Sequence, residues 1–154
     1  MRSRDDRVPT GGAVERALAL GLCGIGGRLD APPPALIEAL AAVDARFGER
    51  TARRLERFAA APDGVFVWTR DVDGLAWLGR LTGPWHYDAA AEASAVDLVH
   101  VRPCAWLPAP VPESRVPAAV RATFARGGRN WQRIRDDDVS RLSGLLYREQ
   151  GAAD

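Results

Sequence analysis

The chain has 154 residues, of which 47% are hydrophobic and 27% are charged. This length and balance predict a single soluble domain with a sizeable core, and they exclude disordered, collagen-like and disulfide-scaffold proteins. The 21 basic residues, all of them arginine, face 20 acidic ones, which gives a net charge of +1. Bulk charge therefore indicates no nucleic acid, membrane or acidic partner, and such binding would depend on local patches.

The cysteines and the apolar runs bear on the compartment. Cys23 and Cys104 lie too far apart for a Cys-x-x-Cys redox or zinc motif. Residues 17–27 are the stretch most similar to a secretory signal, but acidic residues precede it and Leu22 stands where a small residue is required before Cys23. No apolar run reaches the roughly 18 residues of a membrane span. We expect a cytoplasmic protein without membrane contact.

The N-terminal half predicts a flexible end, a strand and two helices. Residues 1–12 are charged and end in two glycines, so we expect a flexible N-terminus followed by one domain over residues 13–150. Residues 13–27 predict a short apolar strand with a flexible, glycine-rich end. Apolar residues then recur at helical spacing from Leu36 to Phe47, and an arginine-rich helix is expected over residues 50–60. Residues 32–61 would thus be a helical insertion.

The central part predicts strands. Residues 65–70 are rich in β-branched and aromatic side chains, residues 75–82 are a second apolar run, and the turn at residues 71–74 between them predicts a hairpin. Further strands are expected over residues 96–101 and 104–107, separated at Pro103. Two more helices are expected, one from Val116 to Phe124 and one beginning at residues 136–138. Strands in the centre with helices on both sides predict an α+β fold with an antiparallel or mixed sheet.

Most catalytic and metal motifs are missing. The glycines of residues 21–27 lack both the Walker and the dinucleotide spacing, so flexible backbone is the expected role. Zinc ligand types are present at Cys23, His86, His100 and Cys104, but their spacing does not support a zinc site. A Cys-His nucleophilic pair is possible by residue type alone, but no motif surrounds either cysteine. The aspartates at 71, 73 and 136–138 are typical of turns and helix starts. We therefore expect no catalytic residue, no metal and no cofactor.

Aromatic residues gather in the predicted strands. Four of the five tryptophans fall within about forty residues, and tryptophan in a strand is often simply core. The alternative is a stacking site for a flat group, flanked by arginines that contact phosphates. Its best part is residues 85–87, where alternation would place Trp85 and Tyr87 on one face and His86 on the other. The residues concerned are Phe66, Trp68, Trp77, Trp85, Tyr87 and Trp106, with Arg70, Arg80 and Arg102.

A second basic region precedes the last helix. Six arginines lie between residues 115 and 135, where Glu113 is the nearest preceding acid, and Trp131 lies among them. Such a stretch is either a local basic patch or a solvated helix face. These arginines are Arg115, Arg121, Arg126, Arg129, Arg133 and Arg135.

Three segments, residues 64–70, 75–87 and 100–107, together resemble the EVE and related domains of the PUA-like superfamily, in particular the DNA-reading modules of modification-dependent restriction systems. Trp85 and Tyr87 occupy the two aromatic positions of that pattern. His100, Arg102 and Trp106 match its later strand, in which Cys104 stands where a β-branched residue is usual. Residues 22–26 are similar to the family's opening strand.

The resemblance implies a small twisted β-barrel with flanking helices that accepts a flipped, often modified base between aromatic side chains. We expect a non-enzymatic reader of DNA modified in its base or backbone, with any nuclease supplied by another domain or subunit. Aromatic walls, polar reading groups and phosphate-contacting or bracing arginines would form its site. The expected site residues are Cys23, Gly24, Ile25, Gly26, Trp77, Arg80, Trp85, His86, Tyr87, Arg102 and Trp106.

Two alternatives remain open at this point. An RNA-binding module of the PUA or YTH type would present the same residues. A barrel that binds a protein or a small molecule would use the aromatic side chains as ordinary core.

Overall fold

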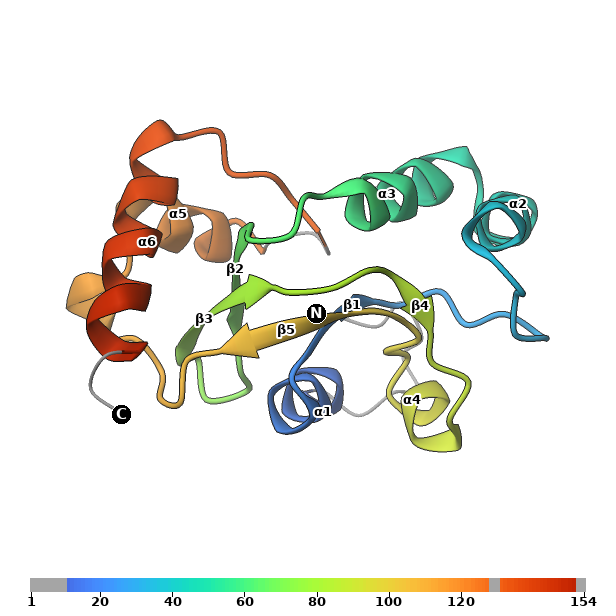
Figure 1. The fold of residues 1–154 in the computed structure, drawn as a ribbon, viewed down its shortest axis with the longest axis horizontal. Coiled ribbons are helices and arrows are strands. Elements are labelled where there is room, and N and C mark those ends of the chain that lie inside the picture. Colours follow the sequence, from blue (N-terminus) through green and yellow to red (C-terminus); the bar gives the residue numbers. More distant parts are fainter. Residues whose placement is uncertain (1–10, 128–130, 152–154) are drawn as a thin grey trace.

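The computed structural model describes residues 11–127 and 131–151. The flexible N-terminus expected at residues 1–12 therefore lies almost entirely outside the described residues. The described chain forms an α+β fold in which a strongly curled antiparallel half-barrel sheet is flanked by helices (Figure 1). The expected fold class is thus confirmed at this level.

The sheet is organised around its last strand. The strand order is β1-β5-β3-β2, and β4 also pairs with β5, so β5 has neighbours on both edges. Its first residues pair with β1 on one side and β4 on the other, whereas its last three pair with β3. The strands are β1 (Leu22–Ile25), β2 (Phe66–Arg70), β3 (Ala76–Leu81), β4 (His86–Tyr87) and β5 (His100–Trp106).

Three groups of helices cover the sheet (Figure 1). In the view of Figure 1, α2 and α3 lie above it, α1 and α4 lie below it, and α5 and α6 lie beside the β2–β3 hairpin. The helices are α1 (Gly12–Leu20), α2 (Leu36–Phe47), α3 (Glu49–Ala60), α4 (Ala91–Ala95), α5 (Ala118–Ala125) and α6 (Asp137–Gly151). A short 3-10 helix, η1, covers Glu113–Arg115.

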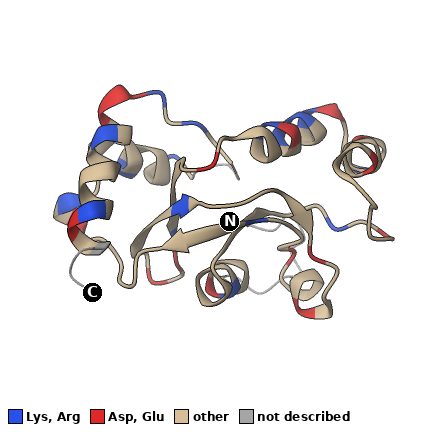
Figure 2. Cartoon of the chain, viewed as in Figure 1, with Lys and Arg blue, Asp and Glu red and all other residues tan. Residues whose placement is uncertain are grey.

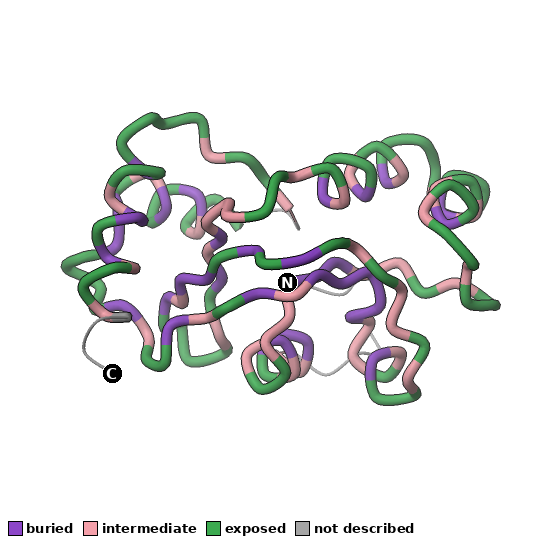
Figure 3. The backbone as a smooth tube through the Cα atoms, in the orientation of Figure 1, coloured by how far each residue is buried: buried purple, intermediate pink, exposed green. Residues whose placement is uncertain are grey.

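The core follows the same division (Figure 3). Leu55 and Phe58 of α3 pack with Cys23, Ile25 and other residues on one face of the sheet. A second cluster joins the hairpin to α5 and α6, and a third packs α1 against residues 98 and 101. Because side chains alternate along a strand, His100, Arg102 and Cys104 of β5 share the face that α2 and α3 cover.

The predicted hairpin and the predicted helices are confirmed. Gly74 takes a positive φ of 85° in the β2–β3 turn, and Asp71 Oδ1 accepts a hydrogen bond of 2.8 Å from the backbone N–H of Leu75. A short aspartate side chain and a glycine are what such a turn requires. Helices α2 and α3 occupy the segment expected to be a helical insertion.

The strand predicted over residues 13–27 is wrong in its first half, where α1 forms. Ala13, Val14 and Ala17 recur at helical spacing and are buried, but this short stripe of small residues also reads as a plain apolar run. Gly21 ends the helix in the left-handed conformation, with φ of 63°. The strand β1 is confined to the four residues that follow.

The break predicted at Pro103 is also wrong, since β5 runs without interruption from His100 to Trp106. Pro103 has no N–H to donate, but its backbone faces the gap where β3 has ended and β4 has not begun. There its carbonyl accepts a hydrogen bond of 3.0 Å from the N–H of Thr82. The strand expected from residue 96 starts only at residue 100, because α4 and a residue with positive φ, Asp97, precede it.

Candidate ligand-binding site

Two strands bring three ring side chains together. Tyr87 of β4 pairs with His100 of β5, and Trp85 directly precedes β4. The Trp85 and His100 rings lie nearly parallel, with centroids 6.1 Å apart, and the Tyr87 ring meets His100 edge-on at 5.2 Å. We call Trp85, Tyr87 and His100 the aromatic cluster. Tyr87 is also fixed by its hydroxyl, which accepts a hydrogen bond of 3.0 Å from the N–H of Leu29.

The hydrogen bond of His100 defines its tautomer. Its Nε2 lies 3.0 Å from the carbonyl oxygen of Gly27, and because a carbonyl only accepts, Nε2 carries the proton. Burial lowers the pKa of His100, although the bond to Gly27 and the charge of Asp97 act in the opposite direction. The neutral ring therefore has an acceptor lone pair on Nδ1. This buried Nδ1 has no hydrogen-bond partner among the described residues.

Trp85 has a second polar atom of this kind. Its Nε1 is buried, and it too has no partner in the described part of the chain. Buried polar atoms nearly always have a partner, so each exception calls for an explanation. The aromatic cluster thus holds one donor and one acceptor that the fold itself does not use.

A loop after β1 holds the Gly27 carbonyl in place. Asp97 Oδ1 accepts hydrogen bonds from the backbone N–H groups of Gly27 at 2.9 Å and Arg28 at 3.1 Å. A Cβ on Gly26 would collide with the carboxylate of Asp97. Gly26 is therefore needed for a close approach of loop and carboxylate, and that approach positions the hydrogen-bond partner of His100.

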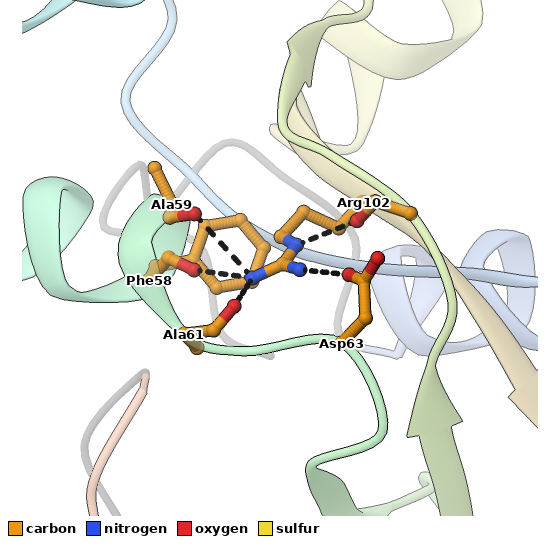
Figure 4. A network of polar contacts seen from close by, with 6 residues as sticks. Phe58, Ala59, Ala61, Asp63 and Arg102 are labelled. Carbon is orange, nitrogen blue, oxygen red and sulfur yellow. Dashed lines mark hydrogen bonds and ion pairs between the residues drawn. The ribbon is translucent and has the colours of Figure 1, made fainter.

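Arg102 is a structural residue and not the phosphate contact considered above (Figure 4). Its side chain is 2% exposed. It donates from Nε to the Gly83 carbonyl at 2.8 Å and from Nη1 to the Phe58 and Ala61 carbonyls at 3.0 and 2.5 Å. Its Nη2 binds Asp63 at 2.7 Å. The bonds to Phe58 and Ala61 satisfy carbonyls at the C-terminal end of α3, so the guanidinium of Arg102 is engaged within the fold, in line with the expected bracing role.

The other expected aromatic walls lie apart from the cluster. Trp106 donates from Nε1 to the carbonyl of Leu22 at 2.9 Å. Trp77 donates to Asp71 Oδ2 at 2.8 Å, beside the hairpin turn. Within residues 11–127 and 131–151, no ring contact joins Trp77 or Trp106 to the aromatic cluster.

The expected polar groups are also redistributed. His86 is exposed, while its neighbours in sequence point to His100, as alternation along the strand predicts. His86 therefore lies away from the cluster, and His100 provides the ring nitrogen there. His100 was missing from the expected site, although the family pattern contained it. Arg80 is exposed on β3 and lies near Gly64.

The β1 residues are structural. Cys23, Gly24 and Ile25 pair with β5 and are buried, so their backbone is part of the sheet. A Cβ on Gly24 would lie 2.7 Å from the carbonyl oxygen of His100. Burial raises the pKa of Cys23 to about 12 and also raises that of Cys104. Both thiols stay protonated and pack as apolar side chains.

Three of the six arginines between residues 115 and 135 are engaged locally. Arg115 binds Glu149, and Arg121 donates to the carbonyls of Glu113 and Val116. Arg126 donates to Thr123. Arg133 and Arg135 are exposed, and Arg129 lies outside the described residues. Among the described residues, no group of three or more His, Cys, Asp and Glu side chains could hold a metal ion.

None of the helices in the described ranges is both long and apolar enough to cross a membrane. No protein-family model matches the chain, and neither does any curated protein or solved structure. The argument for function therefore depends on the geometry of the aromatic cluster and on the resemblance in sequence.

Proposed function

We propose that this chain is a non-enzymatic nucleic-acid reader of the PUA-like, EVE-related type, which holds one flipped base of modified DNA against Trp85. One observation carries the proposal: Trp85 Nε1 and His100 Nδ1 are buried polar atoms without partners in the described chain, and both belong to one aromatic cluster. The order of residues 85–87 and 100–106, which resembles that family, supports it.

Recognition of a flipped base requires an aromatic side chain together with a few polar groups. Extruding a base from a duplex costs a few kcal/mol, and recognition of the flipped base must compensate for that. Stacking on an aromatic side chain contributes about 1–3 kcal/mol per base. Trp85 is only half-buried, so part of its ring is available for stacking.

The two unpartnered nitrogens would add selectivity. Trp85 Nε1–H lies in the plane of the indole ring, so it would donate to an acceptor beside the stacked base, while His100 Nδ1 would accept from an amino group on the edge of that base, such as cytosine and adenine carry. A ligand without such an edge would leave one of the two nitrogens unpaired, which costs about 1–3 kcal/mol. The loop held by Asp97 keeps His100 in the required tautomer before the ligand arrives.

The test is fluorescence anisotropy with labelled duplex DNA, single-stranded DNA and RNA of one sequence, each unmodified and carrying methylcytosine, hydroxymethylcytosine, methyladenine or a phosphorothioate. We expect one modified DNA probe to bind most tightly, with a preference that persists at high salt. Trp85→Ala should weaken that binding roughly 5- to 150-fold, which corresponds to the stacking energy of one base. A preference for RNA would assign the chain to the RNA-binding alternative.

The matched control is Trp77→Ala, which removes the same side chain from the far end of the sheet. Both variants are first checked for a native circular dichroism spectrum and cooperative unfolding. Equal affinity of the folded Trp85→Ala variant and the wild-type chain would overturn the proposal, as would the absence of binding to every probe.

A further inference from the structure

The helix α3 carries an arginine row that the expected site did not include. Arg50 is three and four residues before Arg53 and Arg54, and Arg57 is four and three residues after them, which places all four on one side of a helix. The buried residues of α3, Thr51, Leu55 and Phe58, lie on another side. Figure 2 shows the basic residues repeated along this helix.

Two arginines of the row, Arg50 and Arg57, retain charge that no ion pair with another described residue neutralises. Arg53 pairs with Glu49 at 2.6 Å, across two side chains that are both more than half exposed. Arg50 and Arg57 are exposed and form no ion pair with any other described residue. A shallow hollow of about 360 Å³ lies between the side chains of Glu49, Arg50, Arg53 and Arg57. It is large enough to receive a phosphate group.

The spacing suits a polynucleotide backbone. Arg50 and Arg57 are seven residues apart, or about 10 Å along the helix axis. Consecutive phosphates of one strand are several Å apart, so the row can meet two neighbouring phosphates. Guanidinium groups bind phosphate oxygens through paired hydrogen bonds, which makes arginine well suited to this contact.

The same face does not suit a membrane. A helix that lies on a bilayer inserts large apolar side chains beside its basic ones. The exposed residues of α3 are Glu49, Arg50, Arg53, Glu56, Arg57 and Ala60, and none has a large apolar side chain. Charge complementarity without an apolar anchor therefore favours a polyanion in water.

The arginine row is fixed relative to the aromatic cluster. Leu55 and Phe58 of α3 belong to the core cluster against which Trp85 packs. Arg102 follows His100 by two residues on β5 and holds the last carbonyls of α3 (Figure 4). One strand thus carries the histidine of the cluster and anchors the C-terminal end of the basic helix.

From these contacts we infer that the arginine row of α3, centred on Arg50, Arg53 and Arg57, binds the phosphate backbone of the nucleic acid whose base contacts Trp85. This inference rests on the proposed function. It assigns the phosphate contacts to α3, in place of Arg102, whose guanidinium nitrogens all have partners within the fold.

The test measures how the affinity for the preferred probe depends on salt. Each phosphate contact contributes about 0.9 to the slope of log K against log salt for a duplex and about 0.7 for a single strand. The double variant Arg50→Gln/Arg57→Gln should reduce the steepness by about 1.8 or 1.4, respectively. Its preference for the modified base should stay unchanged. Glu56→Gln, which removes a negative charge from the border of the row, should tighten binding.

The matched control is Arg141→Gln/Arg148→Gln, which removes two arginines at the same seven-residue spacing from α6. It changes the net charge equally and should leave the slope nearly as in the wild type. If both double variants change the slope alike, the effect is one of net charge and the inference is wrong. If the α3 variant keeps the wild-type slope, the inference is also wrong.

Failure of the inference can be distinguished from failure of the proposed function. Suppose that Trp85→Ala abolishes the base preference while Arg50→Gln/Arg57→Gln keeps the wild-type salt slope. The proposed function would then stand, and the role of α3 would be refuted. A chain that binds no nucleic acid probe, but sediments with phosphatidylserine vesicles in an Arg50- and Arg57-dependent way, would refute both.

Discussion

Two polar side chains of β5, Arg102 and His100, lie two residues apart on the same face of the sheet, yet the fold uses them differently. Arg102 donates from all three of its nitrogens, to Gly83, to the end of α3 and to Asp63. His100 is equally buried, at 1% exposed, but only its Nε2 has a partner among the described residues. Burial alone thus does not distinguish a structural polar residue from a functional one.

The difference lies in hydrogen-bonding capacity. Arg102 donates to carbonyls that the end of a helix leaves without partners, so its guanidinium is fully engaged inside the fold. His100 keeps one unused acceptor, and its ring lies parallel to that of Trp85, whose donor is also unpartnered among the described residues. A few polar groups among aromatic side chains are typical of a ligand site. The following predictions test whether the two residues differ in this way.

The largest expected effect is the loss of Arg102. Arg102→Leu leaves the carbonyls of Phe58, Ala61 and Gly83 without this donor, and each buried unsatisfied group costs about 1–3 kcal/mol. We expect the free energy of unfolding in urea to fall by about 3 kcal/mol or more. Arg102→Lys should recover little, because one ammonium cannot reach all of these acceptors.

The control is Asp63→Asn, which changes only the exposed end of the same network. Asp63 is 62% exposed, so its ion pair is screened by water and the loss should be below about 1 kcal/mol. An Arg102→Leu variant as stable as Asp63→Asn would show that the network contributes little, and the contrast with His100 would then be unfounded.

A smaller effect is expected at Trp77, which, unlike Trp85, has a partner for its indole nitrogen. Trp77→Phe removes the bond to Asp71, while Asp71 keeps its bond to Leu75. The free energy of unfolding should fall by about 0.5–1.5 kcal/mol, and the affinity for the preferred probe should not change. Weaker binding by this variant would place the ligand near the hairpin turn and away from the aromatic cluster.

The sequence predicts much of the fold, because strong local signals coincide with the observed elements. The hairpin follows from Asp71 and Gly74 between a β-branched run and an apolar run, and α2 follows from its apolar spacing. The errors have physical causes. The small residues of α1 carry little apolar contrast, and Pro103 is tolerated because a gap between β3 and β4 faces its missing donor.

The candidate site is less predictable from the sequence. Alternation around residues 85–87 correctly separates Trp85 and Tyr87 from His86. The strand register, however, decides that His100 meets Trp85 while Trp106 and Trp77 bond elsewhere. Likewise, no local signal distinguishes Arg102 of β5, which is buried against the end of α3, from the exposed Arg57. The role of Arg102 depends on contacts with Phe58 and Ala61, which lie more than forty positions away in the sequence.

The smallest expected effect is a pH dependence of stability and of binding that arises from His100 and not from Arg102. Arginine keeps its charge throughout, whereas burial lowers the pKa of His100 below its ordinary value. Between that lowered pKa and about 6.5 the unfolded chain binds more protons at this position, so stability falls as the pH is lowered through this window. Affinity for the preferred base should fall with it, because a protonated Nδ1 donates and no longer accepts. Melting temperatures and anisotropy between pH 7.5 and 5.5 measure both effects.

His100→Gln, which retains a donor for Gly27, should remove the His100 part of each effect, whereas His86→Gln should leave both effects unchanged. If His86→Gln and not His100→Gln abolishes the pH dependence of binding, the exposed histidine contacts the ligand and the cluster is structural, as Arg102 is.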